Sequence, residues 1–92
     1  LRPALALAQR ARAAGMECVL TTGIDGACAT LAAAQLVAAL GNRAVPGPAH
    51  GLATSHWLAK DIGTPPPVVA GRIALPPAPG LGFTPAACAP SR

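Results

Sequence analysis

Three acidic side chains and two histidines are the first residues of this 92-residue chain to consider as acids, bases or metal ligands. They are Glu17, Asp25, Asp61, His50 and His56. The histidines are six positions apart, which places them on different faces of any helix, and no third ligand is nearby in the sequence. The carboxylates form no ligand cluster either. We therefore expect no metal site within this chain and interpret both histidines as surface or loop residues.

A polar bend that contains two glycines joins two apolar segments at CVLTTGIDGA, residues 18–27. Glycines let the backbone approach a ligand closely, and the unpaired amides at the start of the following helix suit a carboxylate or phosphate. Asp25 has two interpretations, because it could line a ligand site or simply cap the helix that begins at Gly26. Thr21 and Thr22 are likewise either ligand contacts or ordinary strand residues.

Single residues elsewhere have structural interpretations. Cys18, Cys28 and Cys88 are an odd number without a CxxC pair, which argues against a disulfide framework and a structural zinc site and favours a reducing cytoplasm. Cys18 and Cys28 are expected to be small core residues. We expect Lys60 to be solvated and Trp57 to be a packing anchor.

The composition limits both the core and the partners. Hydrophobic residues make up 52% of the chain but aromatic residues only 2%, so most apolar side chains are small. A chain this short buries only about 60% of the surface that its unfolded form exposes. The net charge of +4 is scattered and lacks aromatic platforms, so nucleic-acid binding is not expected. No apolar run reaches the length of about 20 residues that spans a bilayer, and no signal peptide is recognisable.

The elements that must position the bend follow from hydrophobic patterning. We predict a helix over residues 3–14, a buried strand over 16–21 and a second helix over 26–40 that is apolar nearly all round. A strand at 51–54 and a short helix at 55–60 follow. This order predicts an α/β fold with a parallel sheet, in which ligands bind where strands end.

The last third of the chain is rich in proline and glycine. Val68–Leu75 is predicted to form an edge hairpin, and the sequence from Thr84 is predicted to be a disordered tail. We therefore divide the chain into three parts. Residues 1–62 form strands and helices like those of an α/β barrel, residues 63–83 form an extended segment, and residues 84–92 form the tail.

Several features indicate a piece of a longer protein. Two strands cannot make the expected sheet, and the apolar helix at 26–40 needs neighbours that these residues do not all supply. Leu1 is not a methionine, and Pro3 opens a helix whose preceding strand is missing.

Three segments carry a family resemblance: GMECVLTTGIDGACATLAAAQLVAALG, HGLATSHWLAKDI and PPPVVAGRIALPPAPGLG. Together they resemble the C-terminal part of enolase-superfamily enzymes, specifically o-succinylbenzoate synthases of the muconate-lactonizing subgroup. The resemblance covers about residues 1–83. It implies the C-terminal portion of a (β/α)7β barrel that is incomplete on its own, with a segment that returns to a capping domain.

The resemblance also implies chemistry. In that family Mg²⁺, held by three acidic residues on earlier strands, stabilises an enediolate, and lysines on the second and sixth strands move the proton. The reaction dehydrates 2-succinyl-6-hydroxy-2,4-cyclohexadiene-1-carboxylate in menaquinone or phylloquinone biosynthesis. None of those five residues matches a position of this chain. We therefore expect the metal ligands upstream, in a missing N-terminal part that would be the partner of this chain, and no activity of the chain alone.

The same resemblance places a carboxylate-binding site in this chain, formed mainly by backbone amides. The implied substrate-binding residues are Thr21, Thr22, Gly23, Ile24, Gly51 and Leu52. Asp25 matches an acidic position near the active site and is a possible auxiliary residue. Gly51 has the simpler alternative of a turn residue.

Two other functions stay open. A dipeptide epimerase or N-acylamino-acid racemase would share the fold and use two lysines on an α-proton. A small non-enzymatic helical interaction module would belong to another class altogether.

Overall fold

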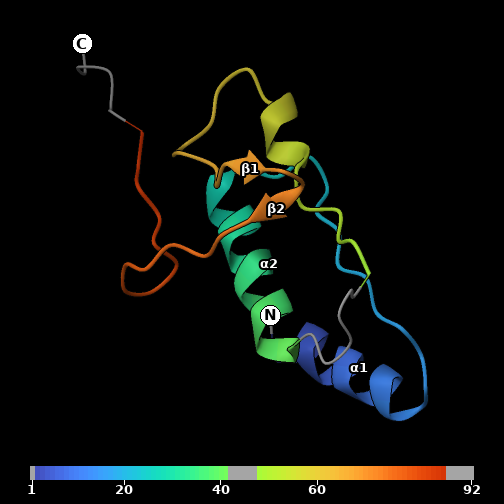
Figure 1. Ribbon diagram of the computed structural model, residues 1–92. Coiled ribbons are helices and arrows are strands. Elements are labelled where there is room, and N and C mark those ends of the chain that lie inside the picture. Colours follow the sequence, from blue (N-terminus) through green and yellow to red (C-terminus); the bar gives the residue numbers. More distant parts are fainter. Residues whose placement is uncertain (1, 42–47, 87–92) are drawn as a thin grey trace.

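The computed structural model describes residues 2–41 and 48–86. A long helix runs through the middle of the chain, a hairpin crosses its N-terminal half, and a second helix packs near its other end (Figure 1). The elements are α1 (Arg2–Ala13), α2 (Ala27–Leu40), the 3-10 helix η1 (Thr54–Trp57), β1 (Val68–Val69) and β2 (Arg72–Ile73).

Helix α1 confirms the first predicted helix and ends as its glycine indicates. Gly15 has a φ of +81°. Its amide donates to the carbonyl of Arg12 at 3.0 Å, and the amide of Met16 donates to Ala11 at 2.9 Å. This pair of bonds is the Schellman arrangement, which pairs the last helical carbonyls and turns the chain away.

Helix α2 confirms the second predicted helix and supplies most of the core. Ala27, Thr30, Leu31 and Ala34 are buried and follow the i, i+3, i+4, i+7 spacing of one helix face. Thr30 tolerates complete burial because its hydroxyl donates to the carbonyl of Gly26 at 3.0 Å.

The two helices meet at the end of α2. The guanidinium of Arg12 donates from Nη1 to the carbonyl of Leu40. A cation at a helix C-terminus pairs an otherwise open carbonyl and complements the helix dipole. Cys18 lies nearby, half-buried, with its Sγ 3.6 Å from the carbonyl of Ala8, so it is a boundary residue and not the core residue that was expected.

The two predicted parallel strands are reduced to one bridge within the described residues. Thr21 pairs with Gly51 in parallel orientation. The amide of Gly51 donates to Leu20 at 2.8 Å, and the amide of Thr22 donates to Gly51 at 2.9 Å. The next amide, that of Leu20, donates to Nδ1 of His50 at 2.9 Å, so an imidazole replaces the backbone acceptor that a longer ladder would provide. Isolated strand pairs of this size have little stability of their own.

The segment after Gly51 also differs from the prediction. The short helix expected over 55–60 is the 3-10 helix η1, which ends at Trp57. The indole side chain of Trp57 is 74% exposed, so its expected role as a packing anchor is wrong for the described structure.

The predicted hairpin is confirmed. Strands β1 and β2 pair antiparallel with Val68 opposite Ile73. The two residues between the strands, Ala70 and Gly71, have φ values of 52° and 73°. Positive φ at both positions is the pattern of a type I′ turn, whose twist matches that of paired strands.

A second backbone bridge joins Gly63 to Pro85 in antiparallel orientation. The amide of Thr64 donates to Thr84 at 3.1 Å, and that of Ala86 donates to Ile62 at 2.7 Å. The sequence placed residues 84–86 in a disordered tail, whereas they are paired here. The rest of that predicted tail, residues 87–92, lies outside the described residues.

The core is small and the shape is elongated. The buried apolar residues are Ala8, Ala27, Leu31, Ala34, Leu36 and Leu52. The radius of gyration is 14.7 Å, whereas a compact domain of this length has about 12 Å. Large apolar side chains such as Leu7, Met16 and Val69 are exposed. Among the described residues, no helix is both long and apolar enough to cross a membrane.

Candidate functional site

The bend at Thr22–Gly23 lies against the segment that follows Gly51, and three hydroxyl contacts join them. Thr54 donates from Oγ1 to the carbonyl of Gly23 at 2.7 Å. Oγ1 of Thr22 lies 2.7 Å from Oγ1 of Thr54 and 3.2 Å from the carbonyl oxygen of Gly51. The structure therefore brings together five of the six predicted substrate-binding residues, and it adds Thr54, which sequence reasoning missed.

The backbone amides at this bend are not equally available to a ligand. The amides of Thr22 and Gly51 are already used in the parallel bridge. The amides of Gly23 and Ile24 have no hydrogen-bond partner within the described parts of the chain. Both residues are exposed, as is Thr21, and the side chain of Ile24 is 57% exposed. The bend is therefore open to solvent, with two donors in sequence.

The N-terminus of α2 is filled by a side chain that sequence reasoning did not consider for this role. Asp61 accepts a hydrogen bond at Oδ1 from the amide of Ala27 at 3.0 Å, across a sequence separation of 34 residues. A Cβ atom at Gly26 would lie 2.9 Å from the same oxygen, so glycine is needed for this approach. The helix terminus that was predicted to suit an anionic ligand already holds the carboxylate of Asp61.

Asp25 does not cap α2, which corrects one of its two interpretations. Residue Gly26 is the N-cap and makes no side-chain hydrogen bond. The carboxylate oxygens of Asp25 lie instead beside Gly23, each 3.9 Å from the position of a Cβ atom built there. Asp25 is exposed beside the two unpaired amides, so water and salt screen much of the repulsion between its carboxylate and an anionic ligand.

Two buried polar atoms near this region lack partners. Oδ2 of Asp61 and Oγ of Ser55 are buried, and neither has a hydrogen-bond partner among the residues that the structure describes. Buried polar atoms in native proteins are normally paired. Asp61 therefore has one carboxylate oxygen paired with the amide of Ala27 and the other buried without a partner in the described part of the chain.

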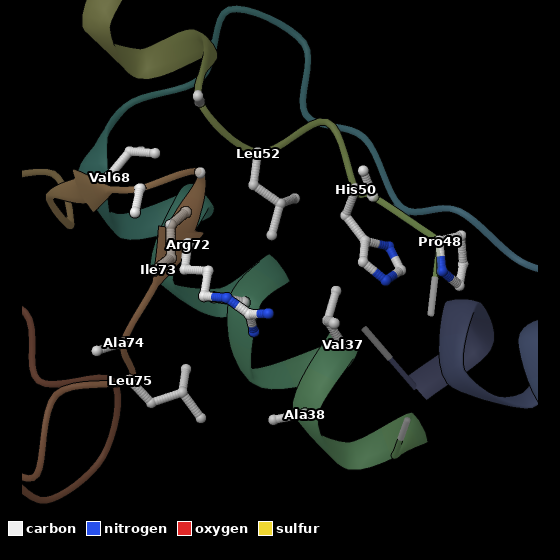
Figure 2. Close-up of a pocket in the computed structure, with 15 residues that line it drawn as sticks. Val37, Ala38, Pro48, His50, Leu52, Val68, Arg72, Ile73, Ala74 and Leu75 are labelled. Carbon is white, nitrogen blue, oxygen red and sulfur yellow. The ribbon is translucent and has the colours of Figure 1, made fainter. Parts of the chain in front are cut away.

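Leu52 occupies a different place from the other predicted site residues. Its side chain is 8% exposed and points into a groove of about 740 Å³ between α2, the hairpin and the chain before η1 (Figure 2). Val37 and Ala38 form the floor, and Arg72 reaches over them from β2. None of residues 21–26 is among the described residues that line this groove. Leu52 is therefore a packing residue as far as its side chain is concerned.

A magnesium site does not fit the described residues. No three His, Cys, Asp or Glu side chains of residues 2–41 and 48–86 come together as metal ligands. One carboxylate oxygen of Asp61 and Nδ1 of His50 are used by backbone amides. His56 and Lys60 are exposed, as expected.

Comparison with known proteins identifies the family. The model of the family described as "Enolase C-terminal domain-like" matches residues 1–88. No curated protein and no solved structure matches this chain. The chain belongs to the enolase C-terminal domain-like family. Membership fits an α/β fold and implies an enzymatic parent protein, and members of the superfamily generally bind Mg²⁺.

Proposed function

We propose that this chain is the C-terminal part of an o-succinylbenzoate synthase and that its bend binds a carboxylate of the substrate. The main support for a carboxylate site is that the amides of Gly23 and Ile24 have no hydrogen-bond partner among the described residues and lie on an open bend beside Gly51. The specific activity rests on the sequence resemblance described above, and the family membership is its coarser support.

The position of the bend suits ligand binding. The chain leaves the parallel bridge at Thr22 and turns before α2 begins at Ala27. Ligands of α/β barrels bind at this end of the strands. Two consecutive amides can each donate to one carboxylate, and hydrogen bonds to a charged acceptor are roughly twice as strong as neutral ones.

The contribution of this chain is binding and orientation. In the proposed reaction the proton α to the substrate carboxylate is removed and the hydroxyl group leaves as water. The acid–base lysines and the magnesium ligands would come from parts of the parent protein outside this chain, because the described residues supply no such cluster. The exposed apolar side chains of α1 and β1, such as Leu7 and Val69, would pack against those parts.

A dipeptide epimerase or N-acylamino-acid racemase would use the same kind of carboxylate site. The two activities are separated by incubating the proposed full-length enzyme with Mg²⁺ and the cyclohexadiene substrate. We expect the absorbance change of dehydration. If the enzyme instead epimerises a dipeptide and does not dehydrate this substrate, the epimerase or racemase activity replaces the synthase activity as the proposed function.

The carboxylate site itself is tested by Gly23→Ala. Gly23 has no positive φ, and the nearest atoms to an added Cβ are 3.9 Å away, so the fold tolerates the substitution. A methyl group beside the two amides would obstruct a ligand. We expect KM for the dehydration substrate to rise about tenfold, equivalent to losing one good hydrogen bond, with the unfolding midpoint unchanged.

Ala78→Val is the matched control, because it adds bulk to an exposed loop residue outside the bend. Its KM should equal that of the wild type. If Gly23→Ala leaves KM unchanged, the bend is not part of the substrate site. This conclusion holds for either of the two proposed activities.

A further inference from the structure

We infer that Thr54 is a positioning residue for the proposed carboxylate site, holding the Gly23–Ile24 peptide so that the amide of Ile24 faces the open side of the bend. This inference rests on the function proposed above. It starts from the bond between Thr54 Oγ1 and the carbonyl of Gly23, at 2.7 Å.

The hydroxyl protons fix the direction of the bonds. Each threonine hydroxyl has one proton to donate. Thr54 uses its proton on Gly23, so the contact of 2.7 Å between the two hydroxyls requires Thr22 to donate to Thr54. The longer contact of Thr22 with Gly51, at 3.2 Å, is then secondary, and the carbonyl of Gly51 keeps the amide of Thr22 at 2.9 Å. The order of donation is Thr22 to Thr54 to Gly23.

This chain of bonds sets the orientation of a peptide group. A trans peptide is planar, so its carbonyl and its amide point in opposite directions. The carbonyl of Gly23 points to Thr54 and also accepts from the amide of Asp25. The amide of Ile24 therefore points away from the segment that carries Thr54, and it has no partner among the described residues.

Without the hydroxyl of Thr54 the peptide is less constrained. Gly23 has no Cβ and adopts many backbone conformations at low cost, so the peptide that follows it can rotate. A rotated peptide would present the carbonyl of Gly23, and not the amide of Ile24, to the ligand. An anion would then meet a partial negative charge. Thr54 holds the donor in place before the ligand arrives, which lowers the cost of binding.

The test compares Thr54→Val with Thr54→Ser in the proposed full-length enzyme. Valine keeps the shape and removes the hydroxyl, whereas serine keeps the hydroxyl. We expect KM for the cyclohexadiene substrate to rise about fivefold to tenfold in Thr54→Val, with kcat within about twofold, and serine to restore KM. Thr64→Val is the matched control, since Thr64 is an exposed threonine outside the hydroxyl chain, and its KM should not change.

A titration with succinate of the wild-type enzyme and of both Thr54 variants gives a readout that does not depend on turnover. We expect the amide resonance of Ile24 to shift downfield on saturation, and the shift to be lost in Thr54→Val but kept in Thr54→Ser. An Ile24 resonance that does not move at saturating succinate overturns the inference, as does an unchanged KM in Thr54→Val. An enzyme whose Ile24 shift is lost in Thr54→Val and kept in Thr54→Ser, but which does not dehydrate the substrate, supports the positioning role and refutes the proposed reaction.

Discussion

Removing the carboxylate of Asp61 should loosen the first turn of α2 more than removing any other acidic side chain of the chain. Asp61 accepts from the amide of Ala27 at 3.0 Å in a partly buried position. Loss of a side-chain acceptor at a helix N-terminus costs about 1 kcal/mol, and loss of a negative charge beside the helix dipole costs about 0.5–1 kcal/mol more. We therefore expect Asp61→Ala to destabilise this turn by about 1.5–2 kcal/mol.

Native-state hydrogen exchange measures this loss locally, so the estimate does not depend on two-state unfolding of the whole protein. The protection of the Ala27 amide should fall by about tenfold or more in Asp61→Ala, since 1.4 kcal/mol corresponds to a factor of ten. Asp61→Asn keeps an acceptor oxygen and loses only the charge, so its effect should be about 0.5–1 kcal/mol.

Asp25→Ala is the matched control, since Asp25 precedes α2 directly but makes no capping bond. Its effect on the Ala27 amide should stay within about 0.5 kcal/mol. The reasoning is refuted if Asp25→Ala reduces protection as much as Asp61→Ala. Gly26→Ala should also expel the carboxylate of Asp61, because its Cβ would lie 2.9 Å from Oδ1. Its effect should therefore not add to that of Asp61→Ala.

Two further substitutions test the backbone. Ala70→Asn should stabilise the hairpin by about 0.5–1 kcal/mol, because Ala70 has a φ of 52° and Asn-Gly is the favoured type I′ pair; a lower midpoint in urea unfolding would contradict the turn assignment. Gly63→Ala should free the 84–86 segment, because its Cβ would meet the ring of Phe83 and lie 2.5 Å from the carbonyl oxygen of Thr84. Proteolysis near Thr84 should then be faster, and an unchanged rate would show that the bridge between Gly63 and Pro85 does not form.

Local signals in the sequence predicted the helices and the hairpin well. Gly15 and Gly41 ended the two helical patterns at the observed places, because the glycine after each helix has a positive φ. The hairpin over Val68–Leu75 was also predicted, although its turn at Ala70–Gly71 was located only by the structure. Helix ends and tight turns depend on residues that are neighbours in the sequence, so they can be predicted from the sequence alone.

Features that depend on distant residues were missed. Nothing in the sequence near Ala27 indicates that Asp61 binds its amide, and the adjacent Asp25 was the more natural candidate for a cap. Thr54 was placed at the end of a strand, with no sign that it bonds to Gly23. The run Cys18–Leu20 predicted a strand buried on both faces, yet Val19 is 52% exposed because the described residues supply one neighbour only.

The alanines of α2 have a consequence for what can lie beside the helix. Ala29, Ala38 and Ala39 are exposed on a helix whose surface is built mostly from methyl groups. Helices with small side chains allow a neighbour to approach to an axis distance of about 8 Å, at the short end of the usual range. A bulky side chain at one of these three positions would leave stability unchanged if the position faces water. It would lower stability if another helix or strand packs against that position. A saturation scan of α2 would thus trace the footprint of its neighbours, position by position.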